Sequence, residues 1–349
     1  MTNSMTKNIL HFYVGTYTDE PSSSNGVAQL ELNTETGELT PLKELITLRN
    51  PSYLAQTPKG LYTFSEVDQQ DKPQLVQLGN IDQSGIAIEG SYPCHLDIDP
   101  TLRFCAVANY GSGNTSVYTL NEVGAPVECI AELFIAGEGP NRDRQTSPHA
   151  HQTTFLRHSP FLAVVDLGTD QVHFYQLDHE GQSLTLHQSL KVTAGSGPRH
   201  LVFNQAETRA YLLCELSETL LTLECHQGQW GLVSEQPLLP GVENGAAASA
   251  IQLSPDEQFL YASCRRQNVI TLFDVSGTAP QWVTAVDTQG DFPRDFTLSR
   301  DGQWLLVANQ HSHNVVSYRR DRQTGQLQPT GFSCHIGSPV CLVEHQEFA

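Results

Sequence analysis

The sequence has few of the features that mark membrane-bound, secreted or nucleic-acid-binding proteins. No apolar stretch is long enough to span a bilayer, and the N-terminus MTNSMTKNILHFYVGTY lacks the apolar segment and cleavage site of a secretion signal. Only 19 of the 349 residues are lysine or arginine, against 38 acidic residues, which gives a formal net charge of −19. Such a charge disfavours nucleic acid and anionic membranes as partners. We therefore expect a soluble, cytoplasmic protein with neither partner.

Motifs for metal, redox and nucleotide chemistry are also absent. The eight cysteines form no C-x-x-C pair and no zinc-type cluster, so reduced, buried thiols are expected. There is no G-x-S-x-G and no glycine-rich phosphate loop leading into a helix. His149 and His151 share one face of a predicted strand, but no carboxylate beside them in sequence offers a third ligand. We expect no metal site and no cofactor.

Helical periodicity is scarce, whereas short strand-like runs are common. Short segments (called words below) such as FLAVVDLG, AYLLCELS, FLYASCRR and WLLVANQH are rich in apolar residues and are bounded by Gly, Pro, Asn or Asp. Turn words such as SPDEQ, SRDGQ and DPTLR precede several of them. The pattern predicts an all-β protein.

A repeat becomes visible when the segments before these turns are aligned. The words are PSYLAQ (from Pro51), PCHLDI (Pro93), PHAHQT (Pro148), PRHLVF (Pro198), ASAIQL (Ala248), PRDFTL (Pro293) and PVCLVE (Pro339), in steps of 42, 55, 50, 50, 45 and 46 residues. Seven copies at this period predict a seven-bladed β-propeller of four-stranded antiparallel blades.

The two ends of the chain predict how the ring closes. The first strand pair, within residues 9–32, has no preceding copy of the repeated word, and the last copy, at residues 339–346, has no strands after it. We expect the C-terminal strand to complete the N-terminal blade, which removes an open sheet edge. Residues 1–349 then form a single domain. Two β-sandwiches, the alternative, would require a boundary in mid-chain that the sequence does not show.

Two columns of residues are predicted to line one mouth of the central channel. The first column is the second residue of each aligned segment: Ser52, Cys94, His149, Arg199, Ser249, Arg294 and Val340. The end of the next strand gives Thr16, Glu66, Asn109, Asp166, Glu215, Cys264 and Asn309, followed by Tyr17, Tyr110, Arg265 and Gln310. Among these, the predicted substrate-binding residues are Arg294, Asn109, Tyr110, Glu66, Asp166, Asn309 and Gln310.

Three arginines at one mouth call for an explanation in a chain this poor in basic residues. Ion pairs that merely fill a wet channel are one possibility. A site for an anion explains the concentration of arginine better, because guanidinium groups bind carboxylate or phosphate through two parallel hydrogen bonds.

Several words together resemble the lactonase family of seven-bladed propellers, which includes bacterial 6-phosphogluconolactonases and fungal carboxy-muconate cyclases. They are FYVGTYT, PCHLDIDPTLRFCAVANYGSG, SPHAHQ, GPRHLVF, ASAIQLSPDEQFLYASCRR and FPRDFTLSRDGQWLLVANQ. The resemblance implies that the catalytic residues are His149, Arg199, Glu215 and Arg265. This sequence departs from the family pattern at SCRR, where Cys264 and Arg266 replace the usual Asn and Gly.

The resemblance implies hydrolysis of a sugar lactone, with 6-phosphogluconolactone as the expected substrate. Either Glu215 or His149 would act as the base, Arg199 would stabilise the oxyanion, and Arg265 and Arg294 would hold the substrate's anionic group. A lactonising cyclase would use the same groups in reverse. A non-enzymatic binding scaffold would instead bind through aromatic patches on its rim. The expected partner is a small anionic sugar lactone, and the expected oligomeric state is a monomer or weak homodimer.

Overall fold

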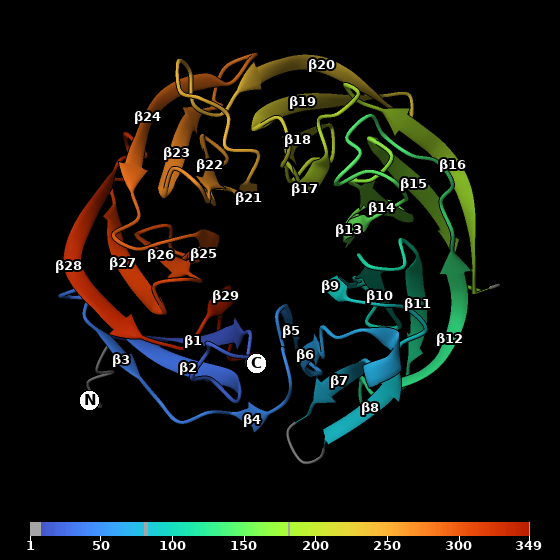
Figure 1. The fold of residues 1–349 in the computed structure, drawn as a ribbon, viewed down its shortest axis with the longest axis horizontal. Coiled ribbons are helices and arrows are strands. Elements are labelled where there is room, and N and C mark those ends of the chain that lie inside the picture. Colours follow the sequence, from blue (N-terminus) through green and yellow to red (C-terminus); the bar gives the residue numbers. More distant parts are fainter. Residues whose placement is uncertain (1–7, 80–82, 181, 349) are drawn as a thin grey trace, which may run out of the picture.

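The described part of the chain forms a ring of seven antiparallel sheets around a central axis (Figure 1). The computed structural model describes residues 8–79, 83–180 and 182–348; the rest of the predicted domain 1–349 lies outside the described residues. The helix found in these ranges is the short 3-10 turn η1 (Gln69–Asp71), and no helix there has the length and hydropathy to cross a membrane. The predicted seven-bladed propeller is confirmed.

Six blades take four consecutive strands each, with the first strand innermost. Their strands are β5 (Leu54–Thr57), β6 (Gly60–Phe64), β7 (Gln74–Leu78) and β8 (Gln83–Ala87); β9 (Pro93–Ile98), β10 (Phe104–Asn109), β11 (Thr115–Leu120) and β12 (Pro126–Leu133); β13 (Ala150–Phe155), β14 (Phe161–Asp166), β15 (Gln171–Asp178) and β16 (Ser183–Lys191); β17 (Pro198–Phe203), β18 (Arg209–Cys214), β19 (Thr219–His226) and β20 (Gln229–Pro237); β21 (Ala248–Leu253), β22 (Phe259–Cys264), β23 (Val269–Asp274) and β24 (Gln281–Asp287); and β25 (Pro293–Leu298), β26 (Trp304–Asn309), β27 (Asn314–Arg320) and β28 (Leu327–His335).

The seventh blade joins the two ends of the chain. Its order is β29 (Pro339–Glu344), β1 (Ile9–Thr16), β2 (Gly26–Asn33) and β3 (Leu39–Pro41), with the short strand β4 (Ile46–Thr47) also paired to β2. β29 runs antiparallel to β1, with Phe12 opposite Glu344 and Val14 opposite Leu342. The predicted closure is confirmed, and the C-terminal strand is the innermost strand of the N-terminal blade.

The predicted turn segments form the same hydrogen-bonded turn in several blades. The first residue of each turn, Asp99, Asn204, Ser254 or Ser299, accepts hydrogen bonds from backbone N–H groups of the turn. The fourth residue has a left-handed backbone in every case, with φ of 58° at Leu102, 52° at Glu207, 55° at Glu257 and 68° at Gly302. Short polar side chains favour such turns because they replace missing backbone partners. The repeat therefore rests on shared turn chemistry rather than on identity.

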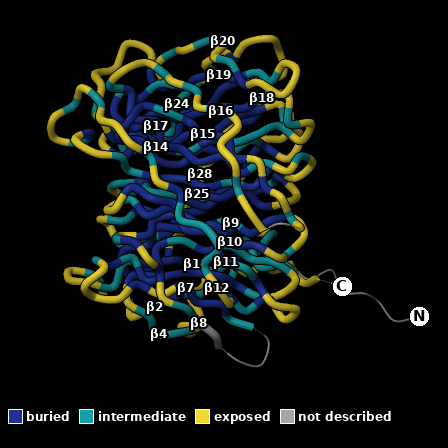
Figure 2. The backbone as a smooth tube through the Cα atoms, turned by 90° about the vertical axis from the view of Figure 1, so that its right-hand side faces the viewer, coloured by how far each residue is buried: buried dark blue, intermediate teal, exposed yellow. Residues whose placement is uncertain are grey.

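The core lies between neighbouring blades, where two apolar sheet faces meet. Trp304 and Leu306 of β26 pack against Phe12 and Leu30 of the closing blade, and all four side chains are nearly or fully buried. Each large apolar side chain removed from water contributes about 1.5–3 kcal/mol. Figure 2 shows buried backbone through the middle of the molecule, while exposed residues collect in the loops along its two sides in this view. The channel mouths are thus made of loops on a rigid frame.

A β-bulge near the start of the inner strand changes the direction of one side chain in six of the seven blades. In the β17–β18 pair, Pro198 lies opposite Cys214 and His200 opposite Leu213, so Arg199 is the extra residue. Arg294 holds the same place between β25 and β26. A β-bulge turns a side chain away from its normal pleat. This geometry directs both arginines into the channel mouth.

Candidate functional site

One residue from each blade is fixed at the mouth by the same backbone hydrogen bond. It follows the second strand, and in six blades its N–H donates to the carbonyl of the residue just before the inner strand, as from Glu215 to Gly197 (2.7 Å) and from Arg265 to Ala247 (3.1 Å). In the remaining blade Glu66 donates to the Asn50 carbonyl, four residues before β5. The seven residues are Tyr17, Glu66, Tyr110, Leu167, Glu215, Arg265 and Gln310. They surround the bulge residues Arg199 and Arg294 and complete the mouth.

Three predicted substrate-binding residues do not occupy this position at the mouth. Asn109, Asp166 and Asn309 come one position earlier, at the last residue of the strand, and none of them has exposed surface. Successive side chains of a strand point to opposite faces, so a shift of one residue reverses the direction. Asn309 donates to the Thr288 carbonyl (3.0 Å), and Asp166 accepts from the Gly168 N–H (2.8 Å). Their contacts are those of turn-stabilising residues.

The register of the SPHAHQ word also differs from the prediction. Ala150, rather than Pro148, occupies the position that Pro198 has in its own blade, because Ala150 pairs with Asp166 as Pro198 pairs with Cys214. His151 is therefore the bulge residue, and His149 precedes the strand. Both histidines still lie near the channel, through different backbone positions.

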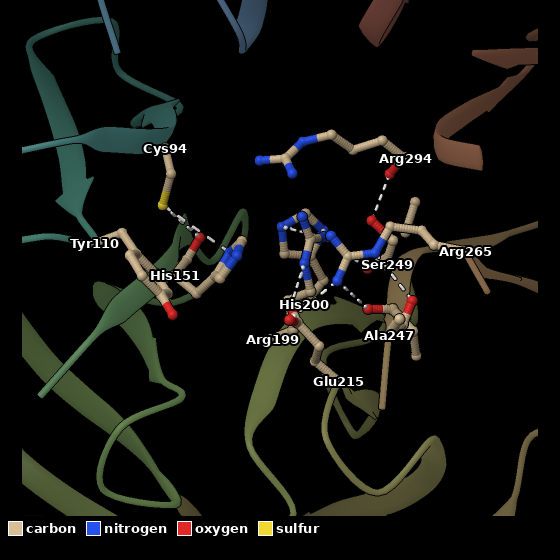
Figure 3. A network of polar contacts seen from close by, with 12 residues as sticks. Cys94, Tyr110, His151, Arg199, His200, Glu215, Ala247, Ser249, Arg265 and Arg294 are labelled. Carbon is tan, nitrogen blue, oxygen red and sulfur yellow. Dashed lines mark hydrogen bonds and ion pairs between the residues drawn. The ribbon is translucent and has the colours of Figure 1, made fainter. Parts of the chain in front are cut away.

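Glu215 is the centre of an arginine cluster (Figure 3). Its Oε1 accepts a hydrogen bond from Nη2 of Arg144 (2.8 Å) and lies 3.0 Å from Nη2 of Arg265. Its Oε2 lies 3.1 Å from Nε of Arg199, an ion pair too bent to be a hydrogen bond. Arg199 is 3% exposed and donates to the Ser249 carbonyl of the next blade (2.8 Å). The carboxylate thus links three guanidinium groups.

The charges of this cluster decide what Glu215 can do. Burial alone would raise the pKa of its carboxyl group, but Arg265, Arg199 and Arg144 outweigh burial and lower that pKa to about 2. Burial, together with neighbouring Arg265, lowers the pKa of Arg199. A carboxylate this acidic holds cations well and accepts a proton poorly near neutral pH.

Arg294 differs from Arg144, Arg199 and Arg265 because no described carboxylate forms an ion pair with it. Its guanidinium makes no hydrogen bond or ion pair with any described residue, and it lies over the ring of Tyr17, 5.1 Å from the ring centre. Figure 3 shows it extending across the mouth from β25. The Glu66 carboxylate accepts instead from the hydroxyls of Tyr17 (3.0 Å to both oxygens) and Ser52. Arg294 therefore has free donors facing the mouth.

His149 is held in one tautomer. Its Nδ1 lies 2.8 Å from the carbonyl oxygen of Tyr110, and a carbonyl can only accept, so Nδ1 carries the proton. The imidazole also stacks on the Tyr110 ring, with centres 4.5 Å apart and planes 17° apart. The neutral ring therefore has its lone pair on Nε2, as a general base requires.

Arg144 is a site residue that the sequence reasoning did not select. It lies in the irregular segment 134–149 between β12 and β13 and reaches both Glu215 and the hydroxyl of Tyr110 (3.2 Å). The only signal was its place in PNRDRQ, which is separated from SPHAHQ by a single residue. At SCRR, Cys264 is fully buried in the core between two blades and Arg266 is exposed.

Three neutral histidines form a layer deeper in the channel. The rings of His95 and His200 lie 5.4 Å apart, and those of His151 and His200 lie 5.3 Å apart. Burial, and then the charge of Arg199, lowers the pKa of all three. Beyond them a cavity of about 420 Å³ is lined by the far halves of the inner strands and not by the arginine cluster. No cluster of three or more metal-binding side chains is found in the described ranges.

Together, four guanidinium groups at the mouth face two carboxylates. Arg144, Arg199, Arg265 and Arg294 lie around Glu215 and Glu66, so this region has an excess of positive charge in a protein of net charge −19. Uncompensated buried charge is costly, and an anionic ligand removes the cost. The fold and these side chains define a seven-bladed propeller with an arginine-rich channel mouth.

Comparison with known proteins agrees with that description. Residues 11–344 match the family described as "Lactonase, 7-bladed beta-propeller", and the chain belongs to this family. It is 32% identical to a 6-phosphogluconolactonase of Bacillus subtilis over 344 residues (95% of this chain, 97% of the relative) and to one of Formosa agariphila over 333 residues (90% and 94%). It is also similar to the solved structure of a periplasmic gluconolactonase of Pseudomonas aeruginosa, with a TM-score of 0.88 and 27% identity, over 96% of this chain and 99% of that one.

Proposed function

We propose that the protein hydrolyses a phosphorylated sugar lactone, 6-phosphogluconolactone, to the open-chain acid. The observation that carries the proposal is the number of guanidinium groups at the mouth, four against two carboxylates, with no ion pair from Arg294 to any described residue. A sugar lactone with a phosphate brings a dianion to this region. The names of the relatives support the same reaction class.

His149 is the base in this proposal, and Glu215 is not. Nε2 of His149 takes a proton from water as the water oxygen attacks the lactone carbonyl. The tetrahedral intermediate then collapses, the bond to the ring oxygen breaks, and His149 returns the proton to that oxygen. The fixed tautomer supports this role, whereas the pKa of about 2 leaves Glu215 ionised and bound to its arginines.

Glu215 instead holds the arginines in place. Through Glu215, Arg199 and Arg265 are fixed before substrate arrives, which is the condition for stabilising an oxyanion without reorganisation. Nη2 of Arg199 has no hydrogen-bond partner among the described residues, and this donor is assigned to the developing oxyanion. Arg294 is assigned to the phosphate group.

The arginines also favour an enzyme over a binding scaffold. They point into the mouth toward Glu215 and the channel, rather than onto an outer surface (Figure 3). A scaffold that bound protein partners would present its binding residues on the rim. The arrangement suits a small ligand that enters the mouth.

Acid release by the purified protein tests the proposal. Lactones also open spontaneously, so the rate is measured with a pH indicator in weak buffer, and the rate without enzyme is subtracted. We expect hydrolysis of 6-phosphogluconolactone by the wild type and a 10²- to 10⁴-fold loss of kcat in His149→Gln. A His149→Gln variant with wild-type kcat would remove His149 as the base. Formation of lactone from a muconate, with no hydrolysis of any sugar lactone, would assign the cyclase reaction instead.

A further inference from the structure

Arg144 is presented to the site by an anchored segment. Next to it, the side-chain amide of Gln145 is fully buried and donates to the Leu167 carbonyl (2.8 Å) and to Asp170 (2.7 Å). The backbone N–H of Gln145 also donates to the Asn141 carbonyl (2.8 Å). The segment between β12 and β13 is thus tied to the next blade at the residue that follows Arg144. The position of Arg144 is set by these bonds.

One nitrogen of Arg144 joins the two halves of the site. Its Nη2 donates both to Oε1 of Glu215 (2.8 Å) and to the hydroxyl of Tyr110 (3.2 Å). Glu215 belongs to the arginine cluster, and Tyr110 is the residue that orients His149 by stacking and through its carbonyl. Arg144 supplies the one hydrogen bond found for the Tyr110 hydroxyl among the described residues.

We infer that Arg144 is a positioning residue that fixes His149 relative to the arginine cluster, acting through the Tyr110 ring. The inference rests on the proposed function. Without the hydrogen bond from Arg144, the hydroxyl of Tyr110 is no longer held in place. The His149 imidazole, which stacks on the Tyr110 ring, then loses its orientation. Glu215 would still keep Arg199 and Arg265 as partners.

Kinetics of three variants test the inference. In Arg144→Gln we expect kcat to fall about 10- to 100-fold with KM changed less than threefold, because a displaced base slows the chemical step more than binding. Tyr110→Phe keeps the ring and the carbonyl and removes only the hydroxyl, and its kcat should fall in the same direction. The double variant should be no slower than Arg144→Gln alone, because both changes break one link. Losses that multiply would overturn the inference.

Arg142→Gln is the matched control. Arg142 lies two residues away, its side chain is 73% exposed, and its ion-pair partner is Glu138 (3.4 Å), outside the site. The control removes the same charge from the same segment, so it should keep wild-type kcat. An equal loss in the control would mean that general charge, not the Tyr110 link, explains the effect.

Nitrogen-15 NMR of the histidine side chains tests the link without any lactone. The His149 signal is identified by its absence in His149→Gln. In the wild type it should show a sharp signal of the Nδ1–H tautomer, and in Arg144→Gln the signal should shift or broaden because the ring is less ordered. An unchanged spectrum overturns the inference even if the enzyme is active. A changed spectrum in a protein without lactonase activity supports the link and rejects the proposed function.

Discussion

Replacing Glu215 by glutamine removes the negative charge that holds the arginine cluster, while the side chain keeps nearly the same shape. The side chain is 4% exposed, so little solvent screening applies. A pKa of about 2 against an ordinary value of 4.5 corresponds to about 3 kcal/mol in favour of the ionised form. Breaking a buried ion pair from one side costs a similar amount, about 3–5 kcal/mol. We therefore expect Glu215→Gln to lower the free energy of unfolding by about 3 kcal/mol.

Thermal and pH-dependent unfolding would measure this loss. For a chain of 349 residues, about 3 kcal/mol corresponds to a fall in Tm of about 4 °C. Because the pKa of Glu215 is lowered in the folded state, its stabilisation is present above about pH 4.5 and disappears as the pH falls toward 2. The difference between wild type and variant should therefore narrow below pH 4.5. The loss of negative charge should also make added inorganic phosphate stabilise the variant more than the wild type.

Glu66→Gln is the control for this experiment. Glu66 lies at the same mouth, but its carboxylate is bound by the hydroxyls of Tyr17 and Ser52 rather than by arginine. Its replacement should cost clearly less stability. The reasoning is refuted if Glu215→Gln melts within 1 °C of the wild type at pH 7, or if the two variants lose the same stability. If Glu215 were the catalytic base, its replacement would abolish activity with little change in Tm.

Three further outcomes follow from the same structure. His149→Gln should keep its Tm within about 2 °C while kcat falls, because the ring is only partly buried; a large drop in Tm would make His149 structural. Arg294→Gln should raise KM for 6-phosphogluconolactone about 10- to 100-fold and leave the constants for unphosphorylated gluconolactone unchanged, since that guanidinium has no ion-pair partner among the described residues; equal effects on both lactones would contradict the phosphate assignment. Deleting residues 338–349 removes β29 and opens the ring, so the chain should be found in the insoluble fraction; a soluble, cooperatively melting product would show that closure is dispensable.

The repeat and its closure were predictable because they depend on patterns of many residues. Apolar runs recur around the ring and turn signals recur in several blades, so an error at one position leaves the count of seven intact. The positions of Arg199 and Arg294 followed from the same alignment, since both come directly after the proline that begins an inner strand.

The details of the site were harder because they depend on register. A strand reverses its side-chain direction at each residue, so the one-residue shift that put Glu215 in a column with Asn109 could not be detected from composition. Pro148 resembled the other prolines, although Ala150 occupies the equivalent place. Arg144 lies in a segment without periodicity, where sequence gives no direction for a side chain.

The specificity for a phosphorylated over a neutral lactone tests the central claim most directly. The measurement is kcat/KM for 6-phosphogluconolactone and for gluconolactone, from acid release above the spontaneous rate, with the same preparation of wild-type protein. The four guanidinium groups at the mouth, against two carboxylates, predict a value at least 100-fold higher for the phosphorylated substrate, and a difference that shrinks as salt is added. Equal values for both lactones, or no release above the spontaneous rate from a folded protein, would contradict the account.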